Sequence, residues 1–339
     1  MQPARFLAQL AVWGLAFAAL NVAVGFVSRN SVPRAVVASI DRSPPVTDIF
    51  LGNSLAQAGA DPKTFAETRP MLSMLNAGLG SSYAPEHLVL LRRTLKLKPA
   101  RVYYGFYDHG LFTPAQGGWD KLVGNRSMAY YTEPEISLRI YAANDPIRAL
   151  QMRIIARLPL LIERQTLWAK VEKMRRRFAQ IGFASAEMNR FGRADDFRLL
   201  EALDAGAFLR RCDELADSRR PFEPPVIAII DQTRQAGARL VLVEMPMPKS
   251  HRERFYDHPE WSRLRERIHD EARRTGAEYV VASDWVGDDG FQDPLHLNSR
   301  GAAEFSRQLA AHDVTAPQAS SGDGPAERKK AAVGTDDAF

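Results

Sequence analysis

The chain has 339 residues, of which 45% are hydrophobic and 25% charged, a composition typical of folded protein and a length that suits one large domain or two small ones. Its net charge of +5 is small for this length, so charge alone selects no anionic partner, and we expect no nucleic-acid binding. The single cysteine, Cys212, excludes an intramolecular disulfide and a zinc site built on cysteines.

An uncharged run of 23 residues, Phe6 to Ser28, lies near the N-terminus between Arg5 and Arg29. A helix of this length, at about 1.5 Å per residue, spans the hydrocarbon core of a bilayer. The sequence therefore predicts a single-pass membrane anchor over residues 1–30. A cleavable signal peptide is the alternative, because the segment contains small residues suited to cleavage, although the run exceeds the usual apolar region of such a peptide. The flanking arginines leave the orientation open.

The chain after the anchor alternates between strands and helices. Residues 31–45 are polar and contain prolines, which favours a stalk. The strands that we expect are 47–51, 71–76, 101–106, 238–244 and 277–282. Helical spacing of Leu and Val over 85–95, and Gly before two of the later strands, are typical of helices that connect parallel strands. The sequence thus predicts an α/β fold with a mostly parallel sheet, in a domain covering 46–314.

The middle of the chain, about 111–225, breaks this alternation and is interpreted as a helical insertion. Within it, apolar and basic residues from Leu158 to Phe178 have the spacing of an amphipathic helix. We expect its apolar face, which includes Trp168, Val171, Met174 and Phe178, to pack on the domain; a membrane-surface or polyanion site is the alternative. Residues 315–339 are rich in Ala, Ser, Gly, Asp and Lys and are expected to form a disordered tail.

Three residues far apart in the chain have the chemistry of a nucleophilic site. Ser54 follows the first expected strand in Gly52-Asn53-Ser54, whereas Asp293 stands three residues before His296 near the last helix. A serine hydroxyl becomes a good nucleophile when an imidazole takes its proton, and a carboxylate fixes the tautomer of that imidazole. Loops at the carboxyl ends of parallel strands converge on one crevice, so we expect these three side chains to meet there and to be catalytic.

These residues resemble the motifs of the SGNH (GDSL-like) hydrolases and their acyltransferase relatives. The first block of that family matches Gly52-Asn53-Ser54, the glycine of the second matches Gly78 in Asn76-Ala-Gly78, and the final Asp-x-x-His matches Asp293 to His296. The resemblance covers about residues 46 to 311 and leaves the middle segment outside. It implies a three-layer, flavodoxin-like α/β sheet. It also implies that the backbone N–H groups of Ser54 and Gly78 hold the oxyanion of an acyl-enzyme reaction.

Two departures from the family pattern favour one branch of the superfamily. Asn53 replaces the usual Asp, and Tyr107 in Gly105-Phe-Tyr107-Asp108 replaces the oxyanion-binding Asn of the third block. With the anchor and the insertion, these departures look like the cell-envelope O-acyltransferase branch, similar to the proteins of alginate acetylation and of teichoic-acid D-alanine transfer. That similarity implies an extracytoplasmic, periplasmic domain on the inner membrane, a membrane-bound O-acyltransferase as partner, and a glycan or acyl-ester substrate. We expect neither cofactor nor metal.

Other candidates and another class of function stay open. Asn53, Tyr107, Asp108 and His109 are expected to line the crevice and bind substrate, although His109 is also explained by a bond to its own loop. His251 and His258 follow a strand and could contact substrate, although solvated loop histidines are commoner; neither has metal-ligand spacing. Gly-x-Ser-x-Gly of an α/β-hydrolase would need glycine where Ala56 stands. The alternative to an enzyme is an inactive subunit that uses the same crevice to hold a glycan or a partner.

Overall fold

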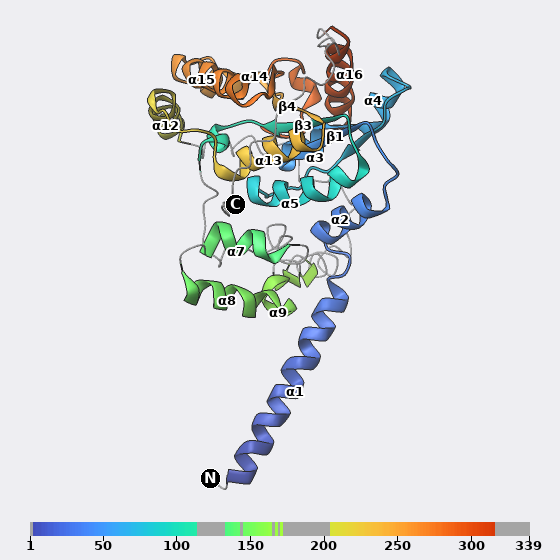
Figure 1. Ribbon diagram of the computed structural model, residues 1–339, viewed down its shortest axis with the longest axis vertical. Helices are drawn as coiled ribbons and strands as arrows, with labels where there is room; N and C mark the ends of the chain where they lie inside the picture. The colour runs from blue at the N-terminus through green and yellow to red at the C-terminus, as the bar shows by residue number, and fades with distance from the viewer. Residues whose placement is uncertain are drawn as a thin grey trace, which may run out of the picture.

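The computed structural model describes residues 3–113, 133–142, 145–164, 167–168, 170–171 and 204–315. Figure 1 shows an α/β body with one long helix, α1, pointing away from it. The elements are α1 (Pro3–Val27), α2 (Val32–Arg42), β1 (Asp48–Gly52), α3 (Ser54–Gly59), α4 (Pro62–Thr68), β2 (Met74–Asn76), α5 (Ala84–Thr94), η1 (Leu95–Leu97), β3 (Arg101–Phe106), η2 (His109–Leu111), α7 (Pro134–Ala142), α8 (Pro146–Ala156), α9 (Pro159–Ile162), α12 (Ala205–Asp217), α13 (Pro224–Gln235), β4 (Arg239–Glu244), α14 (Lys249–His251), η5 (Arg252–Tyr256), α15 (Pro259–Thr275), β5 (Glu278–Val281), η6 (Asp288–Gly290) and α16 (Ser299–Thr315).

The sheet has five parallel strands in the order β2-β1-β3-β4-β5. This is the order of flavodoxin-like doubly wound sheets, in which the carboxyl ends of β1 and β3 flank the point where the strand order reverses. The predicted α/β class and parallel sheet are confirmed, and each strand lies within three residues of its predicted range. Strands β1 and β3 are buried along their whole length, as expected when helices cover both faces.

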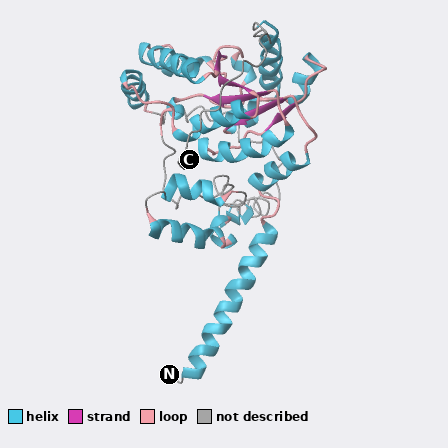
Figure 2. Cartoon of the chain, viewed as in Figure 1, coloured by secondary structure: helices cyan, strands magenta, loops and turns pink. Residues whose placement is uncertain are grey.

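Helices cover the sheet on both sides and make three layers. Helices α5 and α13 lie on one face, and α15 and α16 lie on the other (Figures 1 and 2). One continuous core joins these layers and includes side chains from every strand. Phe50 of β1, for example, stacks on Tyr103 of β3 at 5.8 Å and meets Phe305 of α16 edge-on at 5.9 Å. Helix α16 is thereby fixed next to β1, which brings the C-terminal part of the domain beside the first strand.

A buried ion pair closes the amino end of the sheet. Asp48 begins β1 and Arg101 begins β3, and the two residues are partners in the strand register. The Arg101 Nε donates to Asp48 Oδ1 at 2.7 Å, with both side chains 5% exposed or less, and the Thr47 hydroxyl donates to Asp48 Oδ2 at 2.7 Å. The opposite, carboxyl end of the same strands carries Asn53, Ser54 and the residues after Phe106.

The N-terminal helix α1 has the length and composition of a membrane span. Residues 3–20 are exposed throughout, whereas Asn21 and Val24 are buried against the short helix α9. Asn21 Oδ1 accepts from the Leu160 N–H at 3.1 Å, while its Nδ2 donates to the Phe17 carbonyl. Among the described residues, the rest of the chain therefore packs only on the C-terminal end of α1.

The segment expected to be a polar stalk, 31–45, is mostly helical. Ser31 and Pro33 begin α2, and the apolar side chains of Val36, Val37 and Ile40 fall on its inner face. Ile40 is 2% exposed and belongs to the main core, and α2 packs on α5. The prolines that suggested a stalk stand at the start of this helix and just after its end, positions where proline is tolerated.

The expectation that the apolar face of the middle helix packs on the domain is wrong for the two residues that the structure describes. Trp168 is 71% exposed and Val171 is 54% exposed. Met174, Phe178 and the tail after residue 315 lie outside the described residues. Within the expected insertion, α12 packs on α15 and contributes Cys212 to the main core, whereas α7 and α8 form a small separate core around Met152.

Candidate active site

The end of β1 is built to expose one serine. Gly52 has φ +145°, and a Cβ there would meet the Gly105 carbonyl oxygen at 2.8 Å and the Ala56 Cβ at 2.7 Å, so only glycine fits this turn. Asn53 then caps α3, its Oδ1 accepting from the Leu55 N–H at 3.0 Å. Ser54 consequently becomes the first residue of the helix, at the carboxyl edge of the sheet and half exposed to the cleft.

The loop before α16 presents an acid and an imidazole together. Asp293 Oδ1 accepts from the backbone N–H groups of Leu295 and His296, at 2.9 and 2.8 Å, which ties the loop around the carboxylate. Burial would raise the pKa of Asp293, but the hydrogen bonds from the His296 ring and from these two N–H groups outweigh it and lower the pKa below its usual value. Asp293 is therefore an ionised acceptor at neutral pH.

The structure brings Ser54, His296 and Asp293 together in one hydrogen-bonded chain. His296 Nδ1 lies 2.8 Å from Asp293 Oδ2, and His296 Nε2 lies 2.9 Å from Ser54 Oγ. Because an ionised carboxylate only accepts, Nδ1 carries the proton that faces Asp293. In the neutral imidazole, Nε2 is then the acceptor, aimed at the serine hydroxyl. This is the geometry that a serine needs for its proton to be taken by a base.

Gly78, whose N–H the resemblance assigned to the oxyanion, has a local structural role. Its N–H donates to Asn76 Oδ1 at 2.9 Å, so that donor is already engaged. A Cβ at Gly78 would lie 2.4 Å from the Gln57 backbone nitrogen, and the Asn76 Nδ2 donates to the Ala60 carbonyl at 2.8 Å. The glycine thus lets the loop after β2 pack against α3, the helix that carries Ser54.

The other predicted site residues follow Phe106 at the end of β3 and line the same cleft as Ser54. The negative charge of Asp108, together with burial, raises the pKa of Tyr107, whose carbonyl accepts from the Tyr256 hydroxyl. Asp108 caps η2 through the Gly110 N–H at 2.9 Å. His109 Nδ1 lies 3.0 Å from Thr113 Oγ1, and burial lowers the pKa of His109. His109 is thus held by its own loop.

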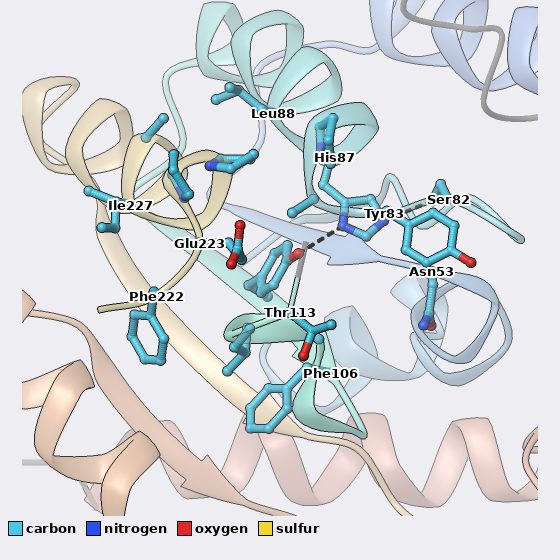
Figure 3. Close-up of a pocket in the computed structure, with 18 of the residues that line it drawn as sticks. Asn53, Ser82, Tyr83, His87, Leu88, Phe106, Thr113, Phe222, Glu223 and Ile227 are labelled. Carbon is cyan, nitrogen blue, oxygen red and sulfur yellow. Dashed lines mark hydrogen bonds between the residues drawn. The ribbon is translucent and has the colours of Figure 1, made fainter. Parts of the chain in front are cut away.

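The cleft is long and has a volume of about 1390 Å³. It begins at Asn53 and Tyr83 and continues past His87 to Phe222, Glu223 and Ile227, as Figure 3 shows. Its lining mixes aromatic rings with both signs of charge. The far wall includes residues of and just before α7, namely Glu133, Glu135 and Arg139. The expected insertion therefore contributes to the same cleft as the serine.

A buried polar network that the sequence analysis missed forms one wall of the cleft. His87 Nε2 lies 2.8 Å from Ser82 Oγ, and His87 Nδ1 lies 2.9 Å from the Tyr104 hydroxyl (Figure 3). The Ser82 hydroxyl donates to the Leu79 carbonyl, so it accepts from Nε2–H, and Tyr104 donates to Nδ1. Burial lowers the pKa of His87 to about 3, which keeps this imidazole neutral. The only sequence signal was the single histidine within the helix expected over 85–95.

Two further histidines noted in the sequence lie away from Ser54. His251 is 3% exposed, and its ring lies 4.7 Å from Phe255 and 5.2 Å from Tyr256. It is therefore part of an aromatic core cluster and not a solvated loop residue; burial lowers its pKa to about 4. His258 stands at the N-cap position of α15, where its side chain makes no capping hydrogen bond. Among the described residues, no group of three or more His, Cys, Asp or Glu side chains could hold a metal ion.

The comparisons with known proteins find likeness only among solved structures. No family model and no curated protein matches the chain. A putative acylhydrolase from Bacteroides fragilis has 10% identity and a TM-score of 0.38, with 84% of this chain and 96% of that chain covered. A GDSL-like lipase from Bacteroides thetaiotaomicron has 9% identity and a TM-score of 0.37, with 83% and 98% covered. An α/β hydrolase from the metagenome of Lake Arreo has 10% identity and a TM-score of 0.33, with 81% and 98% covered.

Proposed function

We propose that this protein is an SGNH-type serine acyl esterase or O-acyltransferase, and the observation that carries the proposal is the hydrogen-bonded chain Ser54, His296 and Asp293. Ser54 Oγ attacks the carbonyl carbon of an acyl ester while His296 Nε2 takes the serine proton. His296 then protonates the departing alcohol oxygen, and the acyl group stays on Ser54. An acceptor hydroxyl or water, deprotonated by the same imidazole, takes the acyl group and restores the serine.

The oxyanion of this reaction has two donors at the start of α3. Backbone N–H groups in the first turn of a helix have no acceptor within that helix, which leaves the Ser54 N–H for the oxyanion. Because Asn53 Oδ1 is turned to the Leu55 N–H, the Nδ2 of the same amide is the second donor that we propose. Asn53 would then replace the amide that is missing where Tyr107 stands, and the engaged N–H of Gly78 is not needed.

The proposed setting is the outer face of the inner membrane, with α1 as a single-pass anchor and an acylated envelope glycan or related ester in the cleft. The volume of the cleft, about 1390 Å³, leaves room for an extended substrate, and the charged side chains of Glu135 and Arg139 in its lining offer polar contacts. A membrane-bound O-acyltransferase is the partner that the sequence resemblance implies. Residues 46–314 form the proposed catalytic domain, with residues 111–225 as its insertion.

Two observations favour the second candidate, a non-catalytic subunit that only holds a glycan or a partner. Tyr107 stands where the family has its oxyanion amide, and the Gly78 N–H is already bonded to Asn76. If Asn53 does not supply the missing donor, the cleft would bind without turning over.

The experiment that separates these two functions is covalent trapping. The full chain, purified in detergent, is incubated with p-nitrophenyl acetate, and peptides are examined by mass spectrometry for an acetyl adduct. We expect the adduct on Ser54 in the wild type and its loss in His296→Ala. Ser82 is the matched internal control, because it also bonds a histidine, but one without a carboxylate and with its pKa held near 3. The absence of any adduct on Ser54, even with envelope glycan present, would support the binding subunit.

A further inference from the structure

Exposed apolar side chains gather in one part of the molecule beside α1. Outside α1 and α2, the large hydrophobic side chains exposed among the described residues are Met71, Tyr83 and Val281, scattered over the α/β body, and five in the middle segment. These five are Ile147, Leu150, Ile154, Trp168 and Val171, each at least 53% exposed. Such a concentration marks an interaction surface.

Helix α8 carries apolar side chains on two opposite faces, one buried and one exposed. Ile147, Leu150 and Ile154 recur at three- and four-residue spacing and share one face. Met152 lies on the opposite face and is 1% exposed, in a small core with α7. The exposed face therefore points away from α7. The exposed Arg157 flanks this face, whereas the Arg153 guanidinium lies 3.9 Å from the Glu135 carboxylate of α7.

The position of this face relative to α1 indicates what covers it. Residues 3–20 of α1, exposed on every side, are about 27 Å long at about 1.5 Å per residue, close to a hydrocarbon core of about 30 Å. The protein contacts begin at Asn21, where α9 packs, so α9 stands at the membrane surface if α1 spans the bilayer. In Figure 1, α8 lies beside α9 across this end of α1, with α7 between α8 and the sheet.

We propose that the exposed face of α8, with Trp168 and Val171, lies in the lipid headgroup region of the membrane that α1 spans; this rests on the proposed anchor. The apolar side chains enter the boundary of the acyl chains, and Arg157 meets anionic headgroups, as in other helices that lie in the plane of a membrane. Trp168 has the amphipathic ring that is enriched at this depth.

This arrangement places the cleft at a fixed height above the bilayer. Helix α8 rests on the lipid, α7 packs on α8, and Glu135 and Arg139 of α7 line the cleft that contains Ser54. One helical layer therefore separates the membrane surface from the cleft wall. A substrate carried by a membrane lipid or a membrane protein would reach the cleft from that side.

The test uses single thiols in the full chain. Cys212 is fully buried, and burial raises its thiol pKa to about 12, so the unmodified chain serves as the labelling blank. Cysteine is introduced by Leu150→Cys, Ile154→Cys or Trp168→Cys, and also by Trp13→Cys in α1 and Met71→Cys, which is 91% exposed on the α/β body. Each variant is labelled with nitrobenzoxadiazole and reconstituted in vesicles of phosphatidylethanolamine and phosphatidylglycerol.

Quenchers placed in the lipid and in the water then report where each label lies. We expect lipid-borne nitroxide near the headgroups to quench positions 150, 154 and 168 several-fold more than position 71, and deep nitroxide to quench position 13. If position 13 is quenched by lipid while 150, 154 and 168 are quenched only by aqueous iodide, the surface contact is wrong and the anchor stands. If the labels at positions 150, 154 and 168 are shielded from both quenchers, a protein contact covers this face and the proposal is wrong. If position 13 lies in water, the anchor fails and the proposal with it, while the acyl-enzyme chemistry of Ser54 is untouched.

Discussion

Ser54 Oγ and His296 Nε2 lie 2.9 Å apart although 242 positions separate them in the chain. The contact is made because β1 delivers the serine at the carboxyl edge of the sheet and α16, which follows the histidine loop, packs on α3. The Asp293 carboxylate completes the chain on the other side of the imidazole.

Removing either member of this pair should abolish nearly all turnover of an activated ester. We expect Ser54→Ala and His296→Ala to reduce kcat to a similar extent, and the double variant to be little worse than either, because the two residues act as one unit. Asp293→Asn keeps the shape but loses the charge and should retain more activity. Steady-state kinetics on the full chain measures this, with Ser82→Ala as the control serine. Additive losses in the double variant would contradict a shared mechanism.

Asn53 can be tested without disturbing the start of α3. Asn53→Asp retains the oxygen that caps the Leu55 N–H but replaces the Nδ2 donor by a negative oxygen facing the oxyanion. We expect kcat for the activated ester to fall by about a hundredfold or more, the usual effect of losing one oxyanion donor, with KM changed little. Circular dichroism should show an unchanged fold. A wild-type kcat in Asn53→Asp would show that the Asn53 Nδ2 does not donate to the oxyanion.

His87 should make the stability of the domain depend on pH. The unfolded chain binds a proton at this imidazole below about pH 6.5, whereas the folded chain does so only near pH 3. The unfolded state therefore binds more protons between these values, and the free energy of unfolding falls as the pH is lowered, by up to about 1.4 kcal/mol per pH unit from this group. Urea unfolding at several pH values between about 4 and 6 measures the slope.

The matched variants for this slope are His87→Gln and Tyr104→Phe. We expect His87→Gln to reduce the slope, because one of two buried imidazoles with lowered pKa is gone; His251 still contributes. Tyr104→Phe should lower stability but keep the slope, because it removes only the hydrogen bond to Nδ1. Parallel curves for the wild type and His87→Gln would show that His87 does not carry the dependence; His251, also buried, would then be the next residue to replace.

The ion pair at the amino end of the sheet should matter far more than one on the surface. Asp48→Ala leaves the Arg101 guanidinium buried without its carboxylate, and we expect a loss of about 3–5 kcal/mol in the free energy of unfolding. The control is Asp41→Ala, which breaks the exposed pair with Arg93 and should cost about 1 kcal/mol or less. Denaturant unfolding compares them, and equal effects would show that burial does not decide the energy of the pair.

Much of the fold was predictable because the strands carry their own signals. The apolar runs ending at Gly52 and Phe106, and the glycines before the later strands, are local features that survive in any context. The order of Ser54 and His296 along the chain was enough to predict that both meet at one edge of a parallel sheet. These inferences need periodicity and topology but no knowledge of packing.

The remaining features depend on which groups contact each surface, and a single sequence does not give this information. Apolar spacing around Trp168 predicts a helix with an apolar face, but either protein or lipid can cover such a face. In the structure, Trp168 is exposed. Gly78 matched its motif, yet the Asn76 side chain two residues earlier takes its N–H. The network around His87 was missed because hydrogen bonds to Ser82 and Tyr104 join residues 5 and 17 positions away without any repeating pattern.

The contact between α1 and α9 affects what happens when the anchor is removed to make a soluble form of the protein. Cutting the chain after residue 30 to obtain a soluble form would strip Asn21 from the Leu160 N–H and Val24 from the surface of α9. The apolar side chains of α9 would then be bared beside the exposed face of α8. A truncated preparation is expected to self-associate through this enlarged patch, so oligomers seen in it would reflect the cut and not the native protein.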